Sequence, residues 1–488
     1  MKKLYQSLLL SLFLLLPLSQ YATIHEVLSY YDGGTLSFRD AVSIASPCDT
    51  ILFPAGMSGG TIRFNSEVGI PVSLTILGPA GGYINFVALA PSIRLLNYTG
   101  GAFPSGIGPS PVCCNVIKRI RFYNGSPSGN GGAIYTPGPI KIDSCHFINN
   151  QAINGGAIAY YETSLGLGLC SMQINDCVFG GNQASQNGGA INVDGGRLSV
   201  SESGITNNNA QEQGGGIWYR NTFLSTSRLI TNQVSLLANT ANQGGAIYHE
   251  SSAFSAGPAS LNALAMAYNE AQEDGGGIYN EAGKIIIKNS PDIHTNKSLH
   301  RSGGAIYSKA DLTVENSRLY KNEASQHGGG IYLGGLLPTL RLTQTELNEN
   351  EASLNGGALF LNSDQAVAFI NQSEFWANQA RNHGGAIYHS AQRLNVDSSR
   401  FESNESHVHG GAIYWDGFAQ ATLDIKQTTL LINRALQGKG GAINMERAGL
   451  LELAESTFDR NQAAMEGGGI AAYGDGGTIY WGGFSANL

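Results

Sequence analysis

The sequence predicts an all-β protein, a right-handed parallel β-helix of about 13 regular rungs with a short N-terminal capping helix. Three observations predict this fold. A glycine-rich motif, Gly-Gly-(Ala/Gly)-(Ile/Leu), occurs thirteen times, 28 residues apart on average. The segments between copies are short and often alternate apolar with polar residues, as strands do. A segment before the first copy, residues 35–45, has the apolar spacing of a helix.

The repeat length separates a β-helix from other repeat folds. A propeller blade needs roughly 40 residues or more, and no copy has the long apolar stripe of a helical repeat. In a β-helix each repeat forms one rung, and differences in repeat length fall in surface loops, where extra residues cost little. The glycine motifs end at Ile134, Ile158, Ile191, Ile217, Ile247, Ile278, Ile306, Ile331, Leu359, Ile387, Ile413, Ile443 and Ile470.

From the second copy onward, an Asn lies five to seven residues before the glycine pair, in the pattern apolar-x-x-Asn-x-(Ala/Ser). Rungs stack about 4.8 Å apart, so a residue that recurs at one place stacks on itself. We expect Ile387 to belong to a buried column. We expect Asn378 at a corner, because Asn side chains can hydrogen-bond along a column and Asn tolerates left-handed turns. In the copies with Phe at the apolar place, the Asn residues are Asn150, Asn182, Asn378, Asn404 and Asn461.

The chain divides into four predicted segments. Residues 1–22 are a signal peptide, with Lys2 and Lys3 before the mostly apolar run 8–16; a membrane anchor, which needs about 20 apolar residues, is the less favoured alternative. Residues 23–125 form an N-terminal cap and the first irregular rungs, residues 126–475 the repeat β-helix, and residues 476–488 a C-terminal tail. We therefore expect an exported protein, at the cell surface, in the outer membrane or secreted. The formal charge of −8 disfavours nucleic acid as a partner.

Export permits disulfides. Cys145 and Cys177 each stand two residues before the column Phe of adjacent repeats, so their Cα atoms should lie about 5 Å apart. This pair is therefore either a disulfide or two buried free thiols. No Cys/His spacing predicts a zinc site, and no cofactor is expected.

Two motifs resemble known families. "LSFRDAVSIASPCDTILFP" (residues 36–54) resembles the N-terminal motif of exported bacterial parallel β-helix proteins, with Leu36 where that motif has Cys and Asp40 where it has Glu. The paired Phe-x-x-Asn and Gly-Gly-Ala-(Ile/Leu/Val) repeats, over roughly residues 120–475, resemble the passenger domains of the polymorphic outer membrane proteins of chlamydiae. This second resemblance implies a surface-exposed autotransporter passenger that acts in adhesion to host cells.

Autotransporters end in a membrane barrel whose strands are about ten residues long. Only 18 residues follow Ile470. The expectation is therefore a passenger that lacks its own β-barrel and uses a separate translocator or outer-membrane partner.

Eight consecutive repeats carry an aromatic residue directly after the core Ile or Leu. Strand alternation directs it away from the core. An exposed aromatic stripe would bind a host-cell or surface protein or glycan; the alternatives are stacking that stabilises the sheet face, or cover by a loop. The stripe comprises Trp218, Tyr248, Tyr279, Tyr307, Tyr332, Phe360, Tyr388 and Tyr414.

No catalytic or metal-binding residue is predicted. A column before the glycine pairs is interpreted as a solvated loop edge rather than a metal site: His327, Asn355, His383 and His409. A column after the Asn has mixed charge and is interpreted as a solvated face: Glu270, Lys297, Glu323, Glu351, Glu405 and Arg434. The predicted function is an exported adhesin-like binding solenoid and not an enzyme. The alternative is a β-helix polysaccharide lyase or glycoside hydrolase, which needs acidic residues clustered in a cleft.

Overall fold

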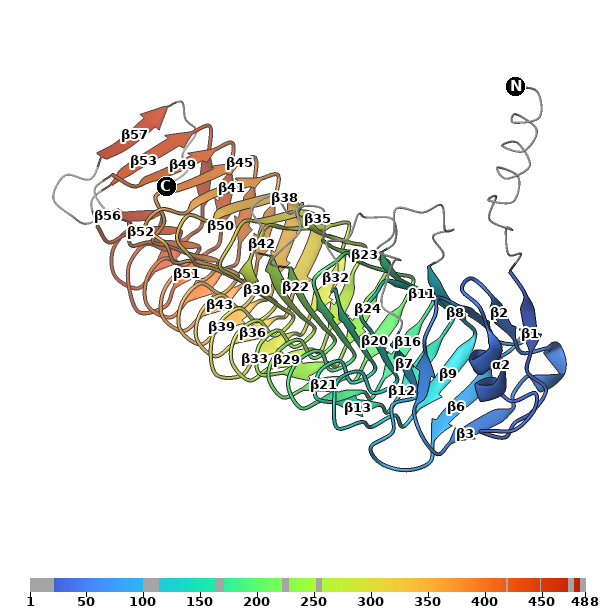
Figure 1. Cartoon of the computed structure of the whole chain (residues 1–488). Helices are drawn as coiled ribbons and strands as arrows, with labels where there is room; N and C mark the ends of the chain where they lie inside the picture. Colours follow the sequence, from blue (N-terminus) through green and yellow to red (C-terminus); the bar gives the residue numbers. More distant parts are fainter. Residues whose placement is uncertain are drawn as a thin grey trace, which may run out of the picture.

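Parallel β-strands stacked along one axis build the molecule (Figure 1), in a computed structural model that describes residues 22–99, 114–162, 171–221, 228–251, 257–417, 420–447, 449–472 and 478–482. One turn contains β41 (Val367–Asn371), β42 (Glu374–Trp376), β43 (Gln379–Ala380) and β44 (Ile387–His389). β41 and β42 belong to a 30-stranded sheet, β43 to a 12-stranded sheet and β44 to a 15-stranded sheet. The predicted parallel β-solenoid is confirmed.

The solenoid has about 15 turns, two more than the number of glycine motifs. Each of the thirteen motifs starts one strand of the 15-stranded sheet, from β10 (Ile134–Thr136) to β56 (Ile470–Ala472). The two additional strands, β4 (Val68–Ile70) and β7 (Leu96–Tyr98), precede β10 in the same sheet. The irregular N-terminal region therefore supplies turns of the same solenoid, without the glycine pair that marks the later ones.

The core is made of columns of identical or similar apolar side chains in register. Ile387 pairs with Leu359 in the preceding turn and with Ile413 in the following turn, and its side chain is fully buried. Phe375 stacks on Phe401 with ring centroids 4.6 Å apart and an interplanar angle of 6°. The predicted core column at Ile387 is confirmed.

Each regular turn bends at residues with a left-handed backbone. In the turn of Ile387 these residues are Gln372, Ala377 and Gly384, with φ of 48°, 53° and 67°. Asn378 itself is not left-handed, contrary to expectation; the residue before it makes the corner. The second glycine of the pair, Gly385, is required for a different reason, because a Cβ there would lie 2.2 Å from the carbonyl oxygen of Gly411 in the next turn.

The Asn residues form a continuous ladder along twelve turns, as predicted. The Nδ2 of Asn378 donates to the Oδ1 of Asn404 at 2.9 Å and to the carbonyl oxygen of Leu347 at 2.7 Å. Its Oδ1 accepts from the backbone N and the Nδ2 of Asn350, both at 3.0 Å. Equivalent side-chain bonds link Asn150, Asn182, Asn208, Asn239, Asn269, Asn296, Asn322, Asn350, Asn378, Asn404, Asn433 and Asn461.

The predicted capping helix is α2 (Phe38–Ile44), at the N-terminal end of the solenoid (Figure 1). Ser37 is its N-cap, and the hydroxyl accepts from the backbone N of Asp40. Phe38 enters the core, with its ring centroid 5.9 Å from that of Phe53, 6.1 Å from Phe64 and 5.0 Å from Phe86. The helix thus closes the core at this end.

Cys145 and Cys177 are free, fully buried thiols, so of the two predicted alternatives the disulfide is wrong. They occupy a column that is mostly Ser or Thr, in which the side chain donates to the carbonyl oxygen two residues earlier. The Sγ of Cys177 donates to the carbonyl oxygen of Asn175 at 3.1 Å and accepts from the backbone N of Cys145 at 3.4 Å. In the next turn, the Oγ of Ser203 donates to the carbonyl oxygen of Ser201 and accepts from the backbone N of Cys177. Both thiols therefore serve as hydrogen-bonding groups in this column, whereas Cys48 and Cys114 are each disulfide-bonded.

The structure describes part of the predicted C-terminal tail but almost none of the predicted signal peptide. The predicted signal peptide lies almost entirely outside the described residues. At the other end, the predicted tail contains β57 (Thr478–Gly482), which pairs with β53 (Leu450–Ala454) and so extends the 30-stranded sheet. Among the described residues, no helix has the length and hydropathy needed to cross a membrane.

Candidate functional site

The aromatic stripe lies on the outer face of the 15-stranded sheet. Its residues pair in register from turn to turn, and the ring centroids of successive members are 4.5–6.2 Å apart with interplanar angles of 4–26°. The strands that carry them are β22 (Ile217–Asn221), β26 (Ile247–Ser251), β30 (Ile278–Ala282), β34 (Ile306–Ser308), β37 (Ile331–Leu333), β40 (Leu359–Leu361), β44 and β48 (Ile413–Trp415).

The stripe is much less exposed than the sequence predicts. Trp218, Tyr248 and Tyr279 form an apolar cluster separate from the main core, so these side chains point outward as expected. Yet these three, with Phe360 and Tyr414, are only 3–6 % exposed, and the other three are half-buried. Rings one rung apart cover each other's faces, which alternation alone does not reveal. The stripe therefore stabilises the sheet face, and little ring area remains for a ligand.

Polar groups surround the stripe. The hydroxyl of Tyr279 donates to Glu281 at 2.9 Å, and the Nζ of Lys309 lies 2.8 Å from the same carboxylate. The hydroxyl of Tyr388 donates to Asp416 at 3.0 Å. Burial, and then the nearby carboxylate of Glu250, raises the pKa of Tyr248 to about 12. The phenols thus remain protonated hydrogen-bond donors at neutral pH.

The histidines before the glycine pairs pack on the stripe instead of lining a solvated edge. The ring centroid of His327 lies 4.3 Å from that of Phe360, and the centroid of His383 lies 4.4 Å from that of Tyr414. Burial lowers the pKa of both imidazoles to about 4, so they are neutral at pH 7. Within the described ranges, no group of three or more His, Cys, Asp or Glu residues is arranged to hold a metal ion.

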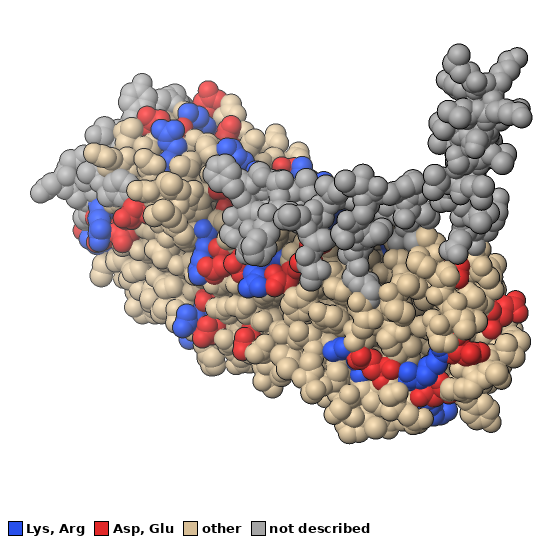
Figure 2. Space-filling model, viewed as in Figure 1, with Lys and Arg blue, Asp and Glu red and all other residues tan. Residues whose placement is uncertain are grey.

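The carboxylate column follows the expected pattern of a mixed surface. Lys297 stands between Glu270 and Glu323 in the 12-stranded sheet and forms an ion pair with Glu323 at 2.9 Å. Figure 2 shows acidic and basic side chains close together in small groups on the visible face, with broad uncharged areas between them. Such a face offers no extended field of one sign for a polyanion.

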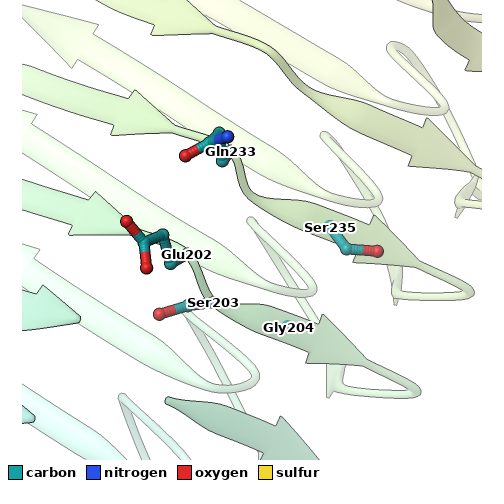
Figure 3. A pocket seen from close by; sticks show the side chains of 5 residues that line it. All are labelled: Glu202, Ser203, Gly204, Gln233 and Ser235. Atoms are coloured by element: carbon teal, nitrogen blue, oxygen red, sulfur yellow. The ribbon is translucent and has the colours of Figure 1, made fainter. Parts of the chain in front are cut away.

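A shallow notch lies on the outer face of the 30-stranded sheet (Figure 3). Two adjacent turns line it with Glu202, Ser203, Gly204, Gln233 and Ser235. The notch is open because a Cβ at Gly204 would meet no atom within 4 Å. Its lining contains one carboxylate, that of Glu202, whereas glycoside hydrolysis usually uses two.

Three aromatic rings in the next three turns of the same sheet were missed by the sequence reasoning, and we call them the ledge: Tyr268, His294 and Tyr320. The ring centroids of Tyr268 and His294 are 5.3 Å apart at 82°, and those of His294 and Tyr320 are 4.7 Å apart at 22°. Tyr268 is 61 % exposed. The available signal was the position of Tyr268 directly before the ladder residue Asn269, where most other turns have a small or polar residue.

Comparison with known proteins supports the resemblance noted in the sequence. Residues 176–194 match the family model described as the Chlamydia polymorphic membrane protein (Chlamydia_PMP) repeat. These residues span one complete unit, with Phe179, Asn182, the pair Gly188–Gly189 and Ile191. A search of curated proteins finds no match. The chain thus carries a polymorphic membrane protein repeat on a parallel β-solenoid.

Proposed function

We propose that this chain is an exported, passenger-type adhesin that lies at the cell surface or is secreted and binds a host-cell or surface protein or glycan. The observation that carries the proposal is the repeat itself. The unit that matches the Chlamydia polymorphic membrane protein repeat is stacked into one continuous scaffold. Proteins with this repeat are named for the membrane, which favours a surface or outer-membrane location for this chain.

The shape of the molecule supports binding rather than turnover. Because each turn contacts only its neighbours, a solenoid presents an extended surface along which many weak contacts can add. The notch supplies a single carboxylate. In this proposal, the chain binds its partner without changing it.

The aromatic stripe contributes to this surface mainly through the polar groups beside it. With most ring area covered, the groups that a partner would meet are the side chains at its margin, such as Glu281 and Lys309, which are partly exposed. Partner contacts in this proposal are therefore spread over several turns and over more than one face.

The test uses cells that produce the native protein. Protease treatment of intact cells should remove the chain while leaving cytoplasmic marker proteins whole, and purified full-length chain should compete with these cells for attachment to host cells. Protection of the chain from protease until the cells are lysed, together with no competition, would contradict the proposal.

A further inference from the structure

Tyr268 has an unfavourable backbone conformation, and burial of its side chain does not compensate for it. Its φ is 58°, a left-handed conformation that is unfavourable for a bulky side chain. The same corner in other turns holds residues such as Asn207, Ala238 and Thr295, all with positive φ. Tyr268 is also 61 % exposed, so its ring gains little from burial. An exposed aromatic residue in a strained backbone position points to a role outside the fold.

The Tyr268 ring is nevertheless held in a defined position. Its ring is nearly perpendicular to that of His294, at 82° with the centroids 5.3 Å apart, and most of it stays exposed. His294 stacks on Tyr320, and the guanidinium of Arg318 lies 4.4 Å from the centroid of the Tyr320 ring. The hydroxyl of Tyr320 donates to Asp292 at 3.5 Å. The ledge is therefore a pre-formed row of rings that ends in the exposed ring of Tyr268.

Small residues stand three positions before the Tyr268 corner, on the outer face of the same sheet. Gly204, Ser235 and Ala265 pair in register in three successive turns, immediately before Asp292. Ala238 occupies the corner equivalent to Tyr268 one turn earlier. The polar notch of Figure 3 opens at the first two of these turns, so the notch and the ledge belong to neighbouring turns of the same sheet.

We propose that the ledge and the notch together bind a neutral oligosaccharide, which gives the proposed adhesin a glycan as its partner and rests on that proposed function. The apolar face of a sugar ring packs on the exposed ring of Tyr268, while sugar hydroxyls hydrogen-bond to the carboxylate, amide and hydroxyl groups of Glu202, Gln233 and Ser235. Turns follow one another about every 4.8 Å, close to the length of one sugar unit in an extended chain.

The charge of the residues that line the notch determines whether a neutral or an anionic glycan is favoured. None of its five lining residues is basic, and Glu202 is an exposed carboxylate at its edge. A sialylated, uronic or sulfated chain would bring like charge to this carboxylate with no cation in the lining to offset it. Beside the ledge, the guanidinium of Arg318 on Tyr320 is already paired with Glu346 at 3.3 Å. Neutral chains are therefore favoured over anionic ones.

The test is a glycan array of neutral, sialylated and sulfated oligosaccharides probed with the full chain. The wild type should bind neutral glycans, and Tyr268→Asn should bind them about tenfold more weakly, the effect of losing one aromatic contact. Because Asn tolerates a left-handed backbone better than Tyr, this variant should melt at the same temperature as the wild type or higher. Ile432→Asn makes a matched change at the same corner of another turn, where φ is 55°, and should leave glycan binding unchanged.

Three results would overturn this inference alone, and a fourth would remove the proposed function as well. Preference for anionic glycans would contradict the neutral ligand. No glycan binding by a wild-type chain that still attaches to host cells would contradict a glycan partner and leave the proposed adhesin in place. Equal binding by the wild type and Tyr268→Asn would show that the ledge takes no part. Binding to neither glycans nor cells would remove both proposals.

Discussion

Asn378 has no spare hydrogen-bonding capacity. Its side chain makes two donor and two acceptor contacts, which is the full set available to an amide. Asn378→Ala leaves the buried backbone N and Nδ2 of Asn350 without this acceptor. We expect the free energy of unfolding to fall by about 2–3 kcal/mol, on the scale of buried unsatisfied groups.

The measurement for this first prediction is chemical denaturation of the two proteins side by side. Gln379→Ala serves as the control, because Gln379 is the next residue and its side chain is exposed; surface substitutions of this kind usually change stability by less than about 0.5 kcal/mol. Equal stability of Asn378→Ala and Gln379→Ala would show that the ladder does not stabilise the fold.

Columns of single residues are the part of this protein that sequence periodicity predicts best. Ile387 and the Asn ladder were predicted because a repeat in the chain becomes a stack in space. The low exposure of Tyr279 was not predicted, because strand alternation gives the direction of a side chain but does not show which neighbouring side chains cover it. For Cys145 and Cys177, spacing predicted proximity but could not decide between a disulfide and two buried free thiols, because the hydrogen bonds of both thiols depend on local backbone geometry.

At the scale of elements, the side chain of Arg39 links helix α2 to the first turns through hydrogen bonds. The Nη1 of Arg39 donates to the carbonyl oxygen of Glu67 at 2.8 Å, and its Nε donates to Asp32 at 2.6 Å. The guanidinium also reaches the carbonyl oxygen of Ser66. Arg39→Ala should therefore loosen the cap, at a cost of about 1–3 kcal/mol for the charge-assisted bonds.

The effect of Arg39→Ala should be local, because each turn of a solenoid interacts with its neighbours. Hydrogen exchange should become faster in α2 and in β3 (Thr61–Phe64), and stay unchanged beyond about residue 300. Arg63→Ala, which removes an exposed arginine from β3, is the control. Uniformly faster exchange along the whole chain would contradict this local role.

The helix also shows how far element boundaries could be predicted. Its existence followed from apolar spacing in residues 35–45, but two of the apolar residues in that segment, Leu36 and Ile44, are exposed. Ser37 caps the helix so that it begins at Phe38, and Leu36, with φ of 61°, lies outside it. The first two turns were harder to count, since β4 and β7 lack the glycine pair.

At the scale of the whole molecule, two fully buried histidines make the free energy of unfolding depend on pH. Burial lowers the pKa of His249 to about 4 and that of His389 to about 3. In the unfolded chain both titrate near pH 6.5. Between about pH 6.5 and 4 the unfolded chain therefore binds more protons than the folded chain, and stability falls as pH falls. Above pH 6.5 these groups contribute no pH dependence.

The predicted loss is on the order of 2–3 kcal/mol per histidine by pH 4. Thermal melting at pH 7, 5.5 and 4 measures it. In His389→Leu the loss should be smaller, and Leu fits this column because Leu333 and Leu361 occupy it in the two preceding turns. An identical decline with pH in the wild type and His389→Leu would show that His389 is not the source.

The most direct test of the account as a whole is a binding isotherm of the native full-length chain on intact host cells, with the cell-surface polysaccharide assayed for cleavage in the same samples. The account predicts saturable binding that is lost when the chain is unfolded by heat, and no shortening of the polysaccharide. Binding that never saturates, or depolymerisation of the polysaccharide by the wild-type chain, would contradict it.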